Sequence, residues 1–166
     1  MKNWTTLGLF LLMCGSLALA ACGGGGKTNE GGGGNKAGGS STASHKRLPV
    51  PDEYKSKKPP KDLSDPDLIA AGKKLYHDGN TANCVSCHGE GGKGDGQLAP
   101  NYKDPAVVDL TAASFQDEVT DQYIFWRITK PAESNAYPAM SMLGYPAGSE
   151  EDNWALTAYV RSLKGS

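Results

Sequence analysis

Cysteine is scarce in this 166-residue sequence, and its four cysteines are not equivalent. Cys14 lies in an N-terminal apolar run and Cys22 follows that run, so only Cys84 and Cys87 fall in the region expected to fold. A four-thiolate zinc site therefore cannot be assembled within the chain. A disulfide and a redox-active Cys-x-x-Cys pair both stay open for Cys84 and Cys87.

The sequence also has no run in which apolar and polar residues alternate, so no stretch predicts a half-buried β-strand. An excess of positive charge is missing from the part expected to fold, because residues 62–166 carry eight basic and fifteen acidic side chains. Such a domain repels phosphates, and we expect no nucleic-acid partner. Its negative charge instead suits docking to a partner with a basic face.

What the sequence does have is helical periodicity. Apolar side chains recur at helical spacing in three stretches, which begin near Ser64, Thr120 and Ser149. Gly72, in the middle of the first stretch, costs about 1 kcal/mol relative to Ala in a helix. We expect the C-terminal helix to approach the first helix closely at Gly72. The fold is therefore predicted to be mostly α.

One short motif, Cys84-Val85-Ser86-Cys87-His88, organises the rest of the chain. It reads Cys-x-x-Cys-His, the attachment sequence of a c-type haem. Each thiol can form a thioether with a haem vinyl group, and the His that follows directly can reach the iron. The motif occurs once, which predicts one covalently bound haem c. The Gly-rich stretch 89–96 neither follows a strand nor opens a helix, so it does not predict a phosphate loop.

The region from Asp65 to Leu163 resembles a class I cytochrome c, the monohaem type. The resemblance rests on residues 72–76, on the haem motif followed by Gly89, and on the closing stretch 154–160. It implies a cytochrome c fold, with three to five helices around one covalent haem and the first and last helices crossing.

The resemblance also implies which residues surround the iron. His88 is expected as the proximal ligand, with its second ring nitrogen bonded to the carbonyl of Pro100, twelve residues later. A Met thioether is expected on the opposite side, which raises the reduction potential relative to two His ligands. Met140 fits the family pattern better, and Met142 is the alternative. Further candidates for contacts with the haem or its propionates are Tyr102, Trp126 and Arg127.

The N-terminus has the features of a secretory signal over residues 1–21, with Lys2, an apolar run and a small-residue stretch before Cys22. The apolar run is short for a membrane span. Residues 19–22 resemble the bacterial lipobox, which implies acylation of Cys22. Plain cleavage near Ala21, leaving a free thiol, is the alternative.

Residues 22–61 are rich in Gly, Lys and Pro, and we expect them to form a lipid-anchored, disordered tether. Residues 62–166 are expected to form the cytochrome c domain. Together these features predict a protein of the bacterial cell envelope, held on a membrane with its haem domain in the periplasm.

The predicted function is single-electron transfer between respiratory or other periplasmic redox partner proteins, by a carrier that is not itself an enzyme. It acts alone or as a subunit of a larger oxidoreductase complex. The alternative is a gas-binding or catalytic haem module with a labile sixth ligand. A zinc or thiol-redox module is a third hypothesis, and it predicts a colourless protein.

Overall fold

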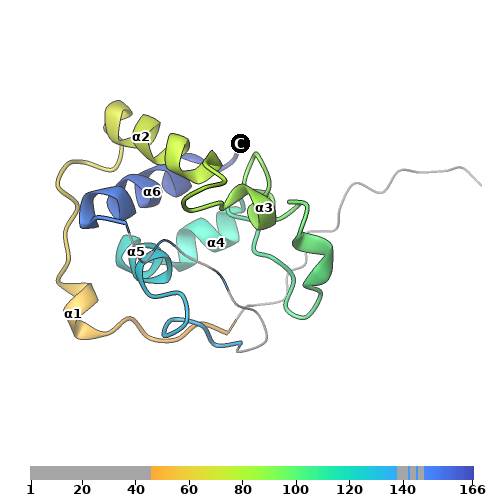
Figure 1. Ribbon diagram of the computed structural model, residues 1–166. Helices are drawn as coiled ribbons and strands as arrows, with labels where there is room; N and C mark the ends of the chain where they lie inside the picture. The colour runs from red at the N-terminus through yellow and green to blue at the C-terminus, as the bar shows by residue number, and fades with distance from the viewer. Residues whose placement is uncertain (1–45, 138–141, 143–144, 146–147) are drawn as a thin grey trace, which may run out of the picture. The chain divides into compact units, whose positions relative to one another are not determined.

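The computed structural model describes residues 46–137, 142, 145 and 148–166 (Figure 1). The predicted signal peptide, Cys22 and Met140 lie outside these residues. In the described part the chain forms six α-helices and one 3-10 helix, and no strand beyond an isolated bridge between Lys103 and Ala106. The elements in chain order are α1 (Asp52–Lys55), α2 (Pro66–His77), α3 (Val85–His88), η1 (Ala99–Asn101), α4 (Ala113–Glu118), α5 (Asp121–Thr129) and α6 (Glu150–Ser162).

The predicted mostly-α fold is confirmed, and the number of helices exceeds the expected three to five because α1 and α3 are only four residues long. The three helices read from periodicity correspond to α2, α5 and α6. None of the helices in the described residues has the length and apolar content of a membrane span.

α2 begins where the sequence predicts. The side chain of Asp65 accepts hydrogen bonds from the backbone N–H groups of Asp67 and Leu68, both at 3.0 Å, and Pro66 takes the first helical position. The buried residues Leu68, Gly72 and Tyr76 then recur at every fourth position. That spacing gives α2 one face for packing.

This face packs against α6, which lies alongside α2 in Figure 1. A Cβ atom on Gly72 would lie 1.9 Å from the carbonyl oxygen of Ala155 and 2.9 Å from the Cβ of Tyr159. Only a residue without a side chain permits this approach. One turn later, the rings of Tyr76 and Tyr159 meet edge to face with centroids 5.0 Å apart. The expected crossing at Gly72 is thus present.

A capping box begins α6 at its N-terminus. The Ser149 hydroxyl accepts from the Asp152 backbone N–H at 3.0 Å, and the Asp152 carboxylate accepts from the Ser149 N–H at 3.1 Å. Residues 153–160 are all buried. A helix that is buried on every side needs neighbours on every side, and α2 and α5 supply two of them.

The structure differs from the predicted domain boundary at residue 62. Residues 46–61, which we call the belt, pack against the helical body instead of forming part of a disordered tether. Tyr54 of α1 is buried with Phe125, Trp126 and Trp154, and Leu48 and Val50 lie at the edge of this cluster. Burial of these apolar side chains offsets the entropy lost when the belt becomes ordered.

The crossing of α2 and α6 makes a specific prediction for Gly72→Ala. The added methyl group meets backbone atoms of α6, so the helices must separate, and we expect a loss of roughly 1–3 kcal/mol in the free energy of unfolding. Chemical denaturation of the purified protein measures this loss. Gly79→Ala is the control, because its Cβ meets only the Asn83 side chain, at 3.9 Å. Equal stability of the two variants would contradict the crossing.

Candidate functional site

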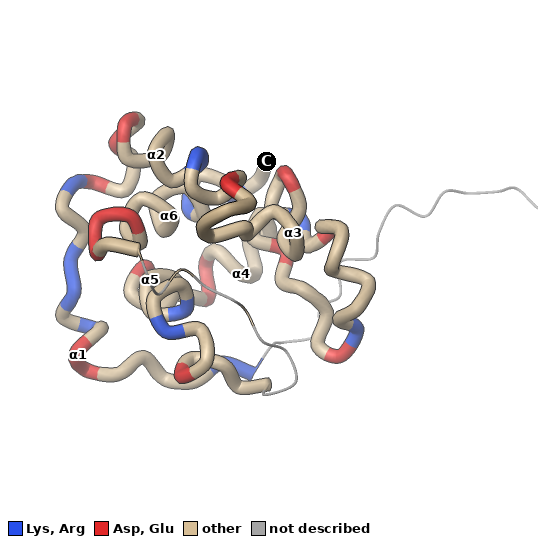
Figure 2. Tube along the Cα trace, in the orientation of Figure 1, with Lys and Arg blue, Asp and Glu red and all other residues tan. Residues whose placement is uncertain are grey.

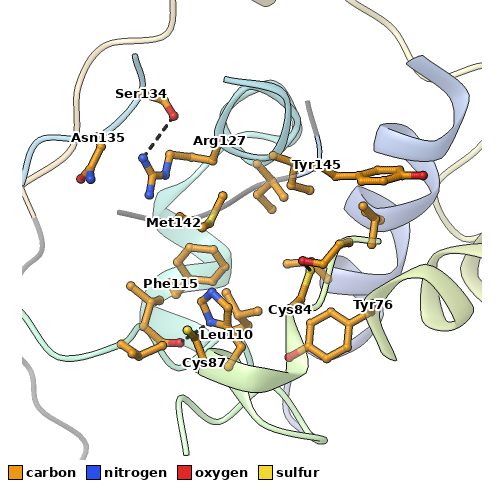
Figure 3. Close-up of a pocket in the computed structure, with 18 of the residues that line it drawn as sticks. Tyr76, Cys84, Cys87, Leu110, Phe115, Arg127, Ser134, Asn135, Met142 and Tyr145 are labelled. Atoms are coloured by element: carbon orange, nitrogen blue, oxygen red, sulfur yellow. Dashed lines mark hydrogen bonds between the residues drawn. The ribbon is translucent and has the colours of Figure 1, made fainter. Parts of the chain in front are cut away.

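The helices enclose a cavity of about 390 Å³, a size typical of small-molecule and cofactor sites. Its walls come from α2, α3, α4, α5 and α6, from the loop 98–110, and from the start of the belt (Figure 3). Most of the lining is apolar. The apolar side chains that line it include Ala82, Val107, Leu110, Phe115, Ile124, Ile128, Leu156 and Val160.

The haem motif forms one wall of this cavity. Cys84 precedes the single turn of α3, and the backbone N–H of His88 donates to the Cys84 carbonyl at 2.9 Å. This turn brings Cys84, Cys87 and His88 to the same cavity.

Both cysteines are free thiols. Burial raises the pKa of Cys84 to about 12 and also raises the pKa of Cys87. Thiol-redox cysteines instead have a lowered pKa, because the thiolate is the reactive form. Within the described residues there is also no group of three or more His, Cys, Asp or Glu side chains that could hold a metal ion. The zinc and thiol-redox hypotheses are therefore disfavoured.

His88 is oriented by a backbone carbonyl that the sequence did not identify. Its Nδ1 lies 3.2 Å from the carbonyl oxygen of Val108. A carbonyl only accepts, so Nδ1 must carry the proton, and Nε2 keeps its electron pair for a metal. Burial lowers the pKa of His88, which favours the neutral imidazole that a metal requires.

Pro100 does not have the predicted role. It lies in η1, is exposed and does not line the cavity. The carbonyl that contacts His88 instead belongs to Val108, twenty positions after His88. The loop between them contains a 3-10 turn and the Lys103–Ala106 bridge, so the partner of His88 comes later in the chain than the family spacing implies.

Glycines allow the loop after His88 to fold against the motif. Gly94 has φ +74°, and its N–H donates to the His88 carbonyl at 2.9 Å. A Cβ on Gly94 would lie 2.7 Å from the Val107 carbonyl oxygen. Because Gly94 has no side chain, residues 107 and 108 can lie beside His88.

α2 is also joined to the motif. The buried hydroxyl of Tyr76 donates to the carbonyl of Gly89, the residue after His88, at 2.8 Å. Burial raises the pKa of Tyr76, so the hydroxyl keeps its proton as a donor. The helix crossing at Gly72 and the haem motif are thus linked through a single side chain.

The opposite side of the cavity carries Met142 and Arg127 (Figure 3). Met142 was the alternative sixth ligand, and its side chain lines the cavity. Arg127 donates to the Ser134 hydroxyl at 3.1 Å and to the Pro131 carbonyl at 3.3 Å. No salt bridge joins Arg127 to a carboxylate among the described residues, and burial lowers its pKa.

Of the other predicted pocket residues, Tyr102 and Arg127 line the cavity, whereas Trp126 is buried in the cluster around Tyr54. The sequence did not identify Val108 or Arg47. Val108 acts through its carbonyl, which every residue has, so no sequence signal marks it. Arg47 lies in the segment that was read as a tether.

The position of Val108 predicts different outcomes for two substitutions. Gly94→Ala displaces residues 107 and 108 from His88, which weakens the hydrogen bond to Nδ1 and makes the imidazole a poorer electron donor. We expect a loss of roughly 1–2 kcal/mol in stability from the left-handed backbone alone, and a higher reduction potential. Pro100→Ala should leave both within experimental error. Denaturation and redox titration measure the two quantities, and a higher potential in Pro100→Ala alone would contradict this assignment.

The residues present fit a covalently attached haem. The cavity is large and mostly apolar, two protonated thiols and a free imidazole nitrogen lie on one wall, and the half-buried Arg127 suits an anionic group such as a propionate. Haem supplies an iron that cycles between ferric and ferrous states.

Comparison with known proteins supports this interpretation. The family model for cytochrome c matches residues 69–164. No curated protein matches significantly. Among solved structures, a chain of the reducing HAO-like protein complex of Kuenenia stuttgartiensis is 29% identical, with a TM-score of 0.48. The match covers 68% of this chain and 53% of that chain, so this protein spans about half the length of that one. From the family match, the chain belongs to the cytochrome c family, and it is an electron-transfer protein with covalently bound haem c.

Proposed function

We propose that the protein transfers single electrons between redox partner proteins through one haem, attached at Cys84 and Cys87 and ligated by His88. The observation that carries this proposal is the shared wall of the cavity. Both thiols and the imidazole line it, and the hydrogen bond between His88 and Val108 leaves Nε2 available. This donor set holds a haem in one orientation.

The remaining residues of the chain tune this site. The Val108 carbonyl makes the imidazole more basic, which stabilises the ferric state. The apolar walls, among them Leu110 and Phe115, limit the access of water and lower the local dielectric. Arg127, a half-buried cation without a carboxylate partner in the described residues, is proposed to bind a haem propionate.

Met142 is proposed as the sixth ligand, in place of Met140, which the sequence favoured. Support comes from the side chain of Met142, which lines the same cavity as His88. Met140 lies outside the described residues. Met and His together raise the potential relative to two histidines. If His88 and Met142 both ligate the iron, no position would be left for a substrate, which favours electron transfer over gas binding.

Substitution of Met142 tests this assignment and the function together. In Met142→Ala, the thioether is lost, so the reduced protein should bind carbon monoxide readily and the Met–iron absorption band should disappear. Wild-type protein should keep the band and bind the gas poorly. Optical spectra of both redox states, before and after the gas is added, make this measurement.

Met140→Ala is the matched control, and we expect it to behave as the wild type. Loss of the band in Met140→Ala but not in Met142→Ala would identify Met140 as the sixth ligand. Ready gas binding by the wild type would instead favour the alternative, a haem with a labile sixth position.

We further propose that the protein is a lipoprotein of the bacterial cell envelope, with residues 1–21 as signal peptide, Cys22 as the acylated residue and the haem domain in the periplasm. The motif at residues 19–22 supports this, and cytochrome c domains typically lie outside the cytoplasm. Several acyl chains on one residue hold a protein on a membrane far more firmly than a single chain. The acidic side chains of residues 62–166 suit redox partners with a basic face.

Substitution of Cys22 tests the anchor. Cys22→Ser removes the acylation site, so the protein should move from the membrane fraction to the soluble fraction of the cell envelope. Fractionation of expressing cells, followed by haem staining, measures this, and mass spectrometry of the wild-type N-terminal peptide should show acyl mass on Cys22. A bare thiol there would exclude lipidation. Cys14→Ser, in the predicted signal peptide, serves as the control and should not change the location.

A further inference from the structure

The start of the belt reaches the haem cavity, although it lies outside the region matched by the family. Lys46 and Arg47 both line the cavity, whereas the family model begins at residue 69. The backbone N–H of Lys46 donates to the Tyr137 hydroxyl at 2.8 Å, and Tyr137 lines the same cavity. The chain therefore enters the described domain at the edge of the cofactor site.

The belt is held along its length, which fixes where Arg47 lies. Tyr54 is buried against Phe125 and Trp126, with ring centroids 6.2 Å apart in both pairs. Further along, Gln122 donates to the Lys57 carbonyl at 3.2 Å, and the Lys57 ammonium pairs with a carboxylate of α6 at 2.7 Å. Figure 2 shows the basic residues of the belt spread along this path between its start and α2.

The Arg47 guanidinium lies in a well-defined place. It sits over the ring of Phe115, 5.9 Å from the centroid, and Phe115 is itself a cavity residue. The side chain is 16% exposed. Its Nη1 pairs with the carboxylate of Glu118. A half-buried guanidinium at the cavity wall, whose carboxylate partner is itself largely exposed, suits a further anionic partner inside the cavity.

Tyr123 shows that Arg47 and Arg127 act on the same part of the cavity. Burial raises the pKa of Tyr123, and the positive charges of Arg127 and Arg47, with a hydrogen bond from Arg47, oppose that rise. Both guanidinium groups therefore lie close to a single phenol that lines the cavity. Glu118 is the only carboxylate paired with either of them in the described residues, and its side chain is 55% exposed.

We propose that Arg47 is part of the haem site, and that with Arg127 it binds the propionate carboxylates of the haem. Two guanidinium groups at one part of the cavity, with one half-exposed carboxylate beside Arg47, leave a net positive charge there. Propionate carboxylates supply negative charge at this place. The belt is then a component of the cofactor site, and Arg47 is a positioning residue that sets the reduction potential. This inference rests on the proposed haem attachment at Cys84 and Cys87.

The sign of the effect follows from charge. The ferric haem carries one more positive charge than the ferrous haem, so a nearby guanidinium disfavours the ferric state and raises the reduction potential. Arg47 also keeps a propionate ionised, because a neighbouring cation lowers the pKa of a carboxyl group. Removal of Arg47 should therefore lower the potential and bring the propionate into the weakly acidic titration range.

The test compares Arg47→Gln with the wild type as full-length, haem-loaded proteins, by spectroelectrochemical titration at low ionic strength over a range of pH. At a fixed electrode potential near the midpoint, Arg47→Gln should raise the ratio of oxidised to reduced haem about threefold. This corresponds to a midpoint ~30 mV lower, at 59 mV per tenfold for one electron. Its potential should also depend on pH in the weakly acidic range.

Two control variants separate charge from packing. Lys58→Gln removes one positive charge from an exposed position of the belt and should leave both readouts unchanged. Arg47→Lys keeps the charge and should restore most of the wild-type potential. If Arg47→Gln retains its attached haem and its Met–iron band but matches Lys58→Gln in both readouts, the role of Arg47 is overturned while the proposed function stands.

If Arg47→Gln does not fold, a further variant tests the proposal. Glu118→Gln removes the carboxylate that contacts Arg47, so at low ionic strength the potential should rise. An unchanged or lower potential in Glu118→Gln overturns the proposal. Absence of covalent haem from the wild type overturns the proposed function as well, and haem staining of the denatured protein distinguishes this outcome from the others.

Discussion

The close contact between α2 and α6 at Gly72 is the constraint on which the haem cavity depends. It sets the depth at which Tyr76 enters the core, and the Tyr76 hydroxyl in turn holds Gly89 directly after the haem motif. It also places Leu156 and Val160 of α6 on the cavity wall. A looser crossing would therefore move two parts of the cavity wall at once, so the helix packing and the cofactor geometry cannot be altered independently.

Desolvation and one hydrogen bond determine the chemistry of the haem motif, Cys84 to His88. Burial keeps both thiols protonated and the imidazole neutral. The Val108 carbonyl then selects the tautomer of His88 that leaves Nε2 free. The same five residues on an exposed, positively charged surface would favour thiolates and redox exchange. The apolar cavity, and not the motif alone, therefore favours haem over zinc or disulfide chemistry.

Sequence reasoning identified the residues whose amino-acid type is itself restricted by the structure. Gly72 pointed to a helix crossing because no other residue fits there, and the spacing of Cys84, Cys87 and His88 is a steric requirement of one porphyrin. Val108 could not be found, because its contribution is a carbonyl placed by the path of a loop. The family spacing pointed to Pro100 instead, and the course of residues 99–107 moves the acceptor further along the chain.

The sequence did not predict the packing of the belt, because its composition was averaged with that of the residues before it. Averaged over residues 22–61, the composition is that of a disordered chain, which hides the few apolar side chains, Leu48, Val50 and Tyr54, that hold residues 46–61 in place. Residues 46–61 therefore do not belong to the disordered tether predicted from composition. Because Lys46 and Arg47 line the cavity, the segment that leads toward the proposed anchor at Cys22 leaves the domain at the haem site. The residues that connect the domain to that anchor then also supply charge to the haem, so a change in the belt should affect both attachment geometry and reduction potential.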